Sequence, residues 1–404
     1  MKQNLHSLSQ RKNKTWKDKD VIKVVTGIRR CGKSTLLQLF AQNLISQGID
    51  KSRIITINLE QLENEQLLDY KTLHDEILSR VTSEEMHYVM IDEVQNVTDF
   101  QKAVDSLYTR PNIDLYITGS NALLLEGTLT TLLSGRYVEI KMQPFSFKEY
   151  KEALDDNSQQ NTTSLMRLYN RYCSQGGFPV VTQLENNSLI HHDYLEGILN
   201  TVLFKDVAQR YKITNLYALE VLVQYLFDNI GNLTSIKKIA DTMTSFGTKI
   251  STNTVAEYLK GLCNSYIFYP ARRYDIKGKK LLKMQAKYYG VDMGLRKIVL
   301  SNQVRDTGRI LENIVFFELK RRYGTVWVGS VGDQEIDFIV TTPQGVEYFQ
   351  VAETIQEEAT KQRELASLKK IPDNNPKTIL TLDDCDPIYV DGIKIMNTLD
   401  FFME

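Results

Sequence analysis

The residues best suited to chemistry lie in the run GIRRCGKST, which joins a strand-like apolar stretch, VIKVVT, to a predicted helix. Two glycines separated by four residues precede a lysine and a serine in this run. Such a loop points backbone N–H groups at phosphate oxygens, and the amino end of the following helix adds a positive dipole. The candidate nucleotide-binding residues are Gly27, Ile28, Arg29, Arg30, Cys31, Gly32, Lys33, Ser34 and Thr35.

Two side chains at the end of this loop have separate expected roles. The ammonium group of Lys33 is expected to reach the β- and γ-phosphates, and the hydroxyl of Ser34 is expected to ligate a magnesium ion. The sequence therefore predicts ATP and Mg²⁺ as cofactors.

An acidic pair follows a second apolar strand, HYVMI, further along the chain. The carboxyl ends of parallel strands meet at one edge of a sheet, so Asp92 and Glu93 should lie beside the phosphate loop. Asp92 would then hold the magnesium ion, while Glu93 polarises the attacking water. The alternative is a surface turn, DEVQ, that opens the next helix.

Three further residues are candidates for responding to the γ-phosphate. The strand LYITG is followed by Ser120 and Asn121, whose polar side chains could sense hydrolysis or, alternatively, cap a helix. Arg136 is a candidate arginine finger, because a guanidinium group neutralises charge that develops on a transferred phosphoryl group. A structural ion pair is the alternative for Arg136.

The elements that position these residues alternate over residues 21–120 between strand-like runs and helical stretches. This order predicts an α/β fold with a parallel sheet covered by helices. From about Phe145 to Ala208 the pattern becomes helical and is interrupted at GGFP. This change favours a helical lid or linker after the sheet.

A winged helix is predicted over residues 211–300, where three helices precede two strands, with IKGK at 276–279 as the wing tip. Between Ile236 and Lys287, eleven basic residues stand against three acidic ones, in a chain whose formal net charge is -1. This local excess is expected of a face that binds DNA phosphates. A protein-binding module and an ordinary solvated surface are the alternatives. The candidate DNA-binding residues are Lys277, Lys279 and Lys280.

From about Gln303 the order changes to a helix, three strands, a helix, a strand and a last helix, which predicts a mixed α/β module. The module resembles a restriction-endonuclease-like core, whose active members carry a carboxylate, any residue and a lysine on the strand after the metal-binding aspartate. Asp337 matches the aspartate, but the matching triplet is Gln350, Val351 and Ala352. Asp337 and Gln350 are therefore predicted to be remnants of a nuclease site that no longer cleaves.

Together these motifs resemble a family of prokaryotic AAA-type P-loop ATPases with a C-terminal restriction-endonuclease-like domain of unknown function. The likeness rests on VVTGIRRCGKSTLL, YVMIDEVQN, ITGSNALLL, QPFSFKEY, GGFP, LENIVFFELKRR and EIDFIV. It implies ATP binding and a winged helix between two α/β modules. The predicted domains are a P-loop AAA-type ATPase domain at 1–145, a helical lid or linker at 146–210, a winged-helix domain at 211–300 and a degenerate endonuclease-like domain at 301–404.

The overall composition agrees with a modular globular protein. Of its 404 residues, 42% are hydrophobic and 25% are charged. No apolar run approaches the roughly 18 residues that a membrane span needs, and the four cysteines have no paired spacing. We therefore expect a cytoplasmic protein without a membrane segment.

These observations predict an ATPase that couples its nucleotide state to a nucleic acid or a protein partner. One alternative is a slow NTP-dependent regulatory or defence switch. An ATP-dependent nuclease is a further alternative, which Ala352 disfavours. The expected partners are ATP, DNA at the winged helix and further copies of the chain.

Overall fold

The computed structural model describes residues 15–125, 135–155, 164–184, 187–278, 280–301 and 306–404. The chain divides into two compact units. The first unit holds residues 1–145 with 264–266, and the second holds the other residues. The predicted end of the ATPase domain, residue 145, is thus also the end of the main segment of the first unit.

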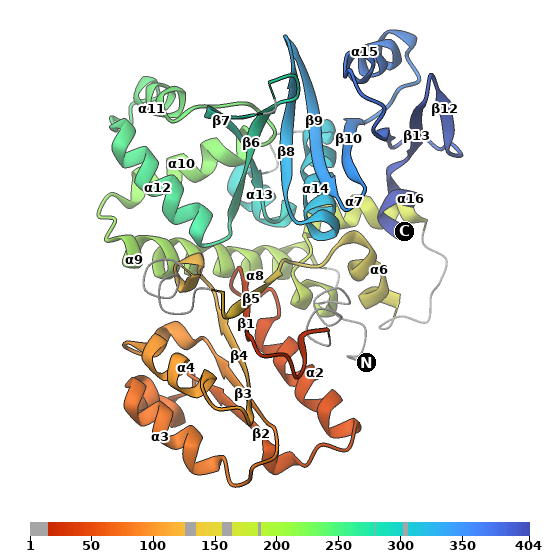
Figure 1. Ribbon diagram of the computed structural model, residues 1–404. Coiled ribbons are helices and arrows are strands. Elements are labelled where there is room, and N and C mark those ends of the chain that lie inside the picture. Colours follow the sequence, from red (N-terminus) through yellow and green to blue (C-terminus); the bar gives the residue numbers. More distant parts are fainter. Residues whose placement is uncertain (1–14, 126–134, 156–163, 185–186, 279, 302–305) are drawn as a thin grey trace. The chain divides into compact units, whose positions relative to one another are not determined.

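A parallel five-stranded sheet with the order β2-β3-β4-β1-β5 forms the centre of the first unit (Figure 1). Four of these strands were expected from their apolar runs. The edge strand β5 was not, because YVEIKM mixes apolar with charged residues. The strands are β1 (Ile22–Gly27), β2 (Ile54–Asn58), β3 (His87–Asp92), β4 (Ile113–Gly119) and β5 (Tyr137–Met142).

Helices cover both faces of this sheet (Figure 1). Helix α2 (Lys33–Ser46) packs Phe40 against Tyr116 on one face. Helices α3 (Tyr70–Arg80) and α4 (Phe100–Tyr108) pack on the other face. Strands β1, β3 and β4 are buried on both sides as a result, which explains their nearly continuous apolar sequences.

A buried ion pair joins β1 to β4 in the middle of the sheet. The side chains of Lys23 and Asp114 form this pair and are only 0% and 2% exposed. The Asp114 carboxylate also accepts hydrogen bonds from the Tyr116 hydroxyl and the Asp18 backbone N–H, each at 3.0 Å. Every oxygen of this carboxylate is therefore satisfied inside the protein.

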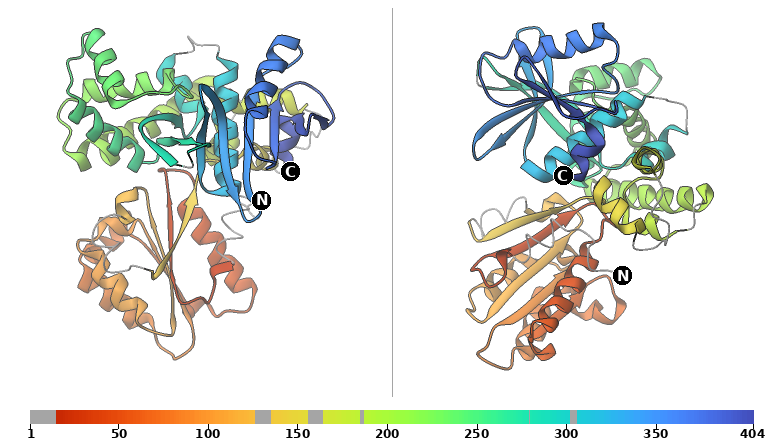
Figure 2. Two further views of the ribbon diagram at one scale, coloured as in Figure 1. Left: turned by 45° about the horizontal axis from the view of Figure 1, so that its top comes forward. Right: turned by 90° about the vertical axis from the view of Figure 1, so that its right-hand side faces the viewer.

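An eight-stranded sheet with the order β12-β13-β11-β10-β9-β8-β6-β7 organises the second unit (Figure 2). Strands β6 and β7 form the hairpin of the predicted winged helix, and β6 pairs in parallel with β8 of the predicted endonuclease-like module. The sheet therefore continues across the boundary predicted at residue 300. The strands are β6 (Phe268–Asp275), β7 (Lys280–Gly290), β8 (Val326–Val331), β9 (Gln334–Thr342), β10 (Gly345–Ala352), β11 (Lys377–Thr381), β12 (Ile388–Val390) and β13 (Ile393–Asn397).

The predicted helices of the second unit occur in the predicted order, and α13 (Met293–Leu300) is an additional helix that was not predicted. The assignment of residues 211–300 to the winged-helix fold stays a prediction. None of the helices in the described part of the chain is long and apolar enough to cross a membrane. The helices of this unit are α6 (Phe147–Asp155), α7 (Leu165–Gln175), α8 (Ser188–Thr201), a π-helical turn (Val202–Ala208), α9 (Gln209–Tyr211), α10 (Leu216–Asp228), α11 (Ile236–Ser245), α12 (Thr252–Asn264), α13 (Met293–Leu300), α14 (Thr307–Tyr323), α15 (Glu358–Lys369) and α16 (Thr398–Met403).

The GGFP sequence connects the predicted linker to the rest of the second unit. Gly176 has a φ of 79°, and a Cβ atom there would overlap the carboxylate of Asp292. Asp292 accepts hydrogen bonds from the backbone N–H groups of Gly177 at 2.6 Å and Leu295 at 3.2 Å. Burial raises the pKa of Asp292 to about 6. The contact fixes the end of α7 against the start of α13, so a glycine is required at position 176.

Removal of the Asp114 carboxylate should strongly destabilise the first unit, because Asp114→Ala leaves the Lys23 ammonium buried without its counter-ion. We expect a loss of about 3–5 kcal/mol in the free energy of unfolding. The double variant Lys23→Met/Asp114→Leu should recover most of this loss, since it removes both charges. Urea unfolding followed by the fluorescence of Trp16 measures this unit, in a Trp327→Phe background that leaves no other tryptophan.

The control for this prediction is Glu76→Ala, which removes a carboxylate from a solvent-accessible ion pair on helix α3 of the same unit. The side chains of Glu76 and Arg80 are 36% and 46% exposed, so water replaces the lost partner and little stability should be lost. Equal losses in Asp114→Ala and Glu76→Ala would contradict the proposed role of the buried pair.

Candidate nucleotide-binding site

The predicted phosphate loop lies between β1 and α2, at the carboxyl edge of the first sheet. Gly27 has a φ of 153°, and a Cβ atom there would overlap the carbonyl oxygen of Met142 on β5. Gly32, with a φ of 105°, begins α2 without a side-chain cap. The N–H groups of the first helical turn are therefore available to a ligand at this end of α2.

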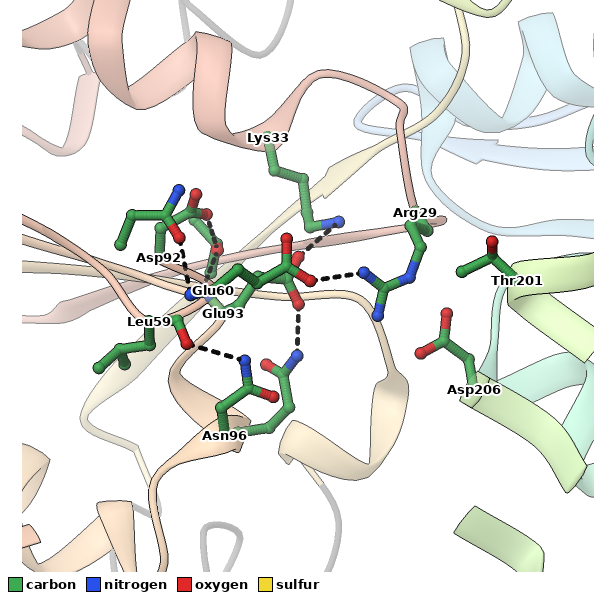
Figure 3. A network of polar contacts seen from close by, with 12 residues as sticks. Arg29, Lys33, Leu59, Glu60, Asp92, Glu93, Asn96, Thr201 and Asp206 are labelled. Atoms are coloured by element: carbon green, nitrogen blue, oxygen red, sulfur yellow. Dashed lines mark hydrogen bonds and ion pairs between the residues drawn. The ribbon is translucent and has the colours of Figure 1, made fainter. Parts of the chain in front are cut away.

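The side chain of Lys33 is buried in the loop and points towards Glu93 (Figure 3). Its Nζ atom lies 3.2 Å from the carbonyl oxygen of Gly27, 3.4 Å from that of Ile28 and 3.4 Å from Oε1 of Glu93. Burial by itself would lower the pKa of Lys33, but Glu93 and the other nearby acidic groups, Asp92 among them, together outweigh this effect, and the pKa lies above its usual value. Lys33 is therefore a cation at the centre of the loop.

The acidic pair lies where the sequence places it, at the end of β3. Asp92 accepts hydrogen bonds from the hydroxyl groups of Ser34 and Thr118, the latter at 2.5 Å. Burial raises the pKa of Asp92, although these two hydrogen bonds oppose the shift. The structure thus brings together the two predicted magnesium ligands, Ser34 and Asp92.

Thr118 on β4 is a residue of this site that the sequence analysis missed. Its hydroxyl donates to Asp92 and accepts a hydrogen bond from the backbone N–H of Glu93 at 2.9 Å. One side chain therefore orients both members of the acidic pair. The available signal was a hydroxyl residue near the end of a buried strand, in LYITG.

Glu93 has an unusual backbone conformation, with a φ of 56° and a ψ of 48°. Residues other than glycine rarely adopt this left-handed conformation, which is concentrated at functional sites. Burial alone would raise the pKa of Glu93, but Lys33 and a hydrogen bond from Gln95 hold it below its ordinary value. Glu93 is therefore an ionised carboxylate with a fixed orientation.

The remaining loop residues differ in their exposure. Ile28 and Cys31 are fully buried, whereas Arg30 is exposed. Arg29 forms an ion pair with Glu60, with Nη1 at 2.6 Å from Oε1, and Figure 3 shows the two side chains pointing towards one another. Thr35 is partly buried in the first turn of α2.

The two predicted sensor residues come directly after β4. Ser120 and Asn121 are 0% and 1% exposed. In the described part of the chain the Ser120 hydroxyl has no hydrogen-bond partner. Their position beside β3 and β1 is compatible with a response to a bound phosphate, and that role stays a prediction.

The structure places Arg136 away from the phosphate loop of its own chain. β5 starts at Tyr137 opposite Ile22, so Arg136 lies at the amino edge of the sheet, about 20 Å from the loop along a six-residue strand. There its Nη1 atom lies 2.9 Å from Oδ1 of Asp105 in an exposed ion pair. An arginine-finger role within one chain is therefore excluded by the geometry, and a role towards a second copy stays a prediction.

The candidate DNA-binding lysines belong to the turn between β6 and β7. Lys277 and Lys280 are exposed, and Lys279 lies outside the described residues. Lys287, which contributed to the predicted positive charge of this region, is only 3% exposed and points away from solvent. It is not part of a basic surface.

The two predicted remnants of a nuclease site, Asp337 on β9 and Gln350 on β10, are in contact. The Gln350 amide oxygen accepts from the backbone N–H of Asp337 at 3.2 Å. Burial and the neighbouring Glu312 raise the pKa of Asp337, although Lys287 opposes the shift. The sequence pattern predicts no lysine at this site, whereas the structure places Lys287 of β7 beside Asp337.

Comparisons with known proteins agree with this geometry. Residues 19–151 match the family model of an AAA domain, and residues 166–306 match that of a domain of unknown function (DUF8612). A protein of Haemophilus influenzae described as uncharacterised is 39% identical over 390 residues, which is 96% of each chain. The chain belongs to the family of this protein.

The uncharacterised protein MJ1544 of Methanocaldococcus jannaschii is also similar, with 29% identity over 86% of this chain and 78% of its own. The Walker-type ATPase PABY2304 of Pyrococcus abyssi has a similar fold, with a TM-score of 0.51 and 15% identity over 73% of this chain and 95% of its own. The prediction of an AAA-type P-loop domain is confirmed. The DUF8612 match crosses the boundaries predicted at residues 210 and 300, and the endonuclease-like nature of the last module stays a prediction.

Substitution of Thr118 tests whether its hydroxyl orients the acidic pair. Thr118→Val preserves the side-chain shape but removes the hydrogen bonds to Asp92 and Glu93. We expect hydrolysis of MgATP, measured as steady-state phosphate release, to fall about 10- to 100-fold. Thr118→Ser should retain most of the rate.

The control is Thr56→Val on β2, because Thr56 belongs to the same sheet but is exposed. It should have the rate of the unmodified protein. A Thr118→Val protein as active as the Thr56→Val protein would exclude the orienting role.

Proposed function

We propose that the first unit binds ATP with Mg²⁺ and hydrolyses it. The observation that carries this proposal is the convergence of one cation, one hydroxyl and two carboxylates on the phosphate loop. Lys33 binds the β- and γ-phosphates, Ser34 and Asp92 hold Mg²⁺, and Glu93 orients the attacking water. The metal ion would neutralise charge on the transferred phosphoryl group.

The contact between Lys33 and Glu93 gives this site a simple switch. Phosphate oxygens compete with the Glu93 carboxylate for the ammonium group, which is held only at 3.4 Å. ATP binding therefore releases Glu93 to accept a hydrogen bond from water. We propose that Ser120 and Asn121 respond to the γ-phosphate at the adjacent end of β4.

We further propose that the chain couples its nucleotide state to a nucleic acid. Exposed lysines at the β6–β7 turn support this choice over a protein partner. Arg136 would act only in a homo-oligomer, where it could reach the site of a second copy.

A slow regulatory or defence switch is the second candidate function. It is favoured by the pairing of the Glu93 carboxylate with Lys33 and Gln95, because the carboxylate must be released from both before it can act on water.

Two substitutions should separate ATP binding from hydrolysis. Lys33→Ala removes the charge that pairs with phosphates, so we expect binding of a fluorescent ATP analogue to be lost. Glu93→Gln removes only the activation of water, so binding should persist while phosphate release falls by about 10²- to 10⁴-fold.

Lys51→Ala provides the control, because Lys51 is an exposed lysine of the same unit. Its binding and turnover should be normal. Unchanged ATP affinity in Lys33→Ala would exclude the phosphate-loop assignment.

Reversal of charge at the wing should weaken DNA binding. The triple variant Lys277→Glu, Lys279→Glu, Lys280→Glu is expected to bind duplex DNA less tightly than the unmodified protein. Its affinity should also depend less steeply on salt, because fewer counterions are released from DNA. Fluorescence anisotropy with a labelled duplex at several salt concentrations measures both effects.

A triple change to Glu at Lys51, Lys369 and Lys370 is the control, since it alters net charge equally at exposed positions outside the wing. Equal weakening in both triple variants would show that only net charge matters.

Hydrolysis of ATP measured with and without DNA separates the two candidate functions, since DNA should stimulate only a DNA-coupled ATPase.

A further inference from the structure

A buried cluster of charged side chains lies in the second unit, far along the chain from the phosphate loop. Its centre is the ammonium group of Lys287 on β7, which is 3% exposed. The Nζ atom lies 2.9 Å from Oε1 of Glu312 on α14, 2.7 Å from Oε1 of Glu335 and 3.8 Å from Oδ1 of Asp337, both on β9. Three carboxylates thus converge on one cation.

Several polar atoms of this cluster have further partners within the protein. Tyr289 donates its hydroxyl to Oε1 of Glu312 at 2.6 Å, and the backbone N–H of Val351 donates to Oδ2 of Asp337 at 2.9 Å. The amide oxygen of Gln350 is taken by the backbone N–H of Asp337. One oxygen each of Glu312, Asp337 and Gln350 is therefore already bound to a donor of the protein.

The resemblance to endonucleases implies a divalent metal at Asp337, and the residues present do not fit one. A magnesium ion requires oxygen ligands at about 2.0–2.1 Å in octahedral geometry. Here the convergence point holds an ammonium group, position 350 carries a neutral amide, and position 352 carries alanine. A second cation at this point would face the positive charge of Lys287.

We propose that Lys287 is the permanent cation of this module, standing where a nuclease-like module would bind a divalent metal. Its ammonium group offsets part of the negative charge of the carboxylates of α14 and β9 and occupies the point on which they converge. The module is catalytically silent for a different reason from the one predicted from sequence. A cation is present at the site, but it is the ammonium group of Lys287 on β7. Unlike a metal ion, an ammonium group cannot serve as a Lewis acid.

This arrangement also ties two predicted domains together. Lys287 belongs to the hairpin of the predicted winged helix, whereas its three partners belong to the predicted endonuclease-like module. Because burial makes an unpaired charge costly, separation of the two parts would break three ion pairs at once. Residues 211–404 should therefore unfold as one cooperative unit.

The first test leaves the cluster itself unchanged and is made without nucleotide. Urea unfolding of the second unit is followed by the fluorescence of Trp327 on β8, in a Trp16→Phe background. Millimolar MgCl₂ or MnCl₂ should leave the midpoint unchanged relative to KCl at equal ionic strength. A rise in midpoint that disappears in Asp337→Ala, or metal-dependent cleavage of DNA that disappears in that variant, would overturn the proposal.

Substitution of the cation gives the second test. Lys287→Met leaves the three carboxylates without a counter-ion, so its unfolding midpoint should fall well below that of Lys280→Met, an exposed position on the same strand. Mn²⁺ should raise the midpoint of Lys287→Met, because the vacated position then fits a divalent ion. A Lys287→Met protein as stable as Lys280→Met, or one indifferent to Mn²⁺, would contradict the proposal.

A double variant covers the case in which Lys287→Met fails to fold. Lys287→Met/Glu312→Gln removes one cation and one carboxylate, and should therefore be more stable than the single variant in the same unfolding experiment. No gain in the double variant would show that Lys287 acts through packing instead of charge.

Discussion

The parallel pairing of three strands is the constraint on which the nucleotide site depends. Ile91 of β3 lies opposite Ile117 of β4, and Thr26 of β1 lies opposite Gly119 of β4. In this register the three strands end together, so the phosphate loop, the acidic pair and the Thr118 hydroxyl meet at one edge. A shift by one residue would turn Thr118 to the opposite face and remove the hydrogen bonds to Asp92 and Glu93.

The parts of this site that the sequence predicts are those encoded by neighbouring residues. The phosphate loop is a single run with fixed spacing, and the acidic pair follows one apolar strand, so neither needs knowledge of the fold. Thr118 could not be assigned in this way, because its partners at 92 and 93 are on another strand. Its role depends on strand order, which a local pattern does not contain.

The location of Arg136 also depends on strand pairing, which a local sequence pattern does not contain. The sequence around it offers a basic residue before a run that mixes apolar with charged residues, and this pattern was compatible with a phosphate contact. Pairing of β5 with β1 fixes the direction of that strand and places Arg136 at its beginning, at the edge opposite to the loop. A local pattern likewise does not show that β6 pairs with a strand more than fifty residues later, across the boundary predicted at 300.

Three buried lysines show why geometry must decide what a charge does. Lys23 and Lys287 have carboxylate partners at close range, which hold both ammonium groups within the fold. Lys33 is equally buried, but its nearest partners are two backbone carbonyls and one carboxylate at 3.2–3.4 Å. Weaker contacts make its ammonium group the one that can move to phosphate oxygens at little cost. A count of charges gives all three the same value, although only Lys33 is placed to exchange its partners.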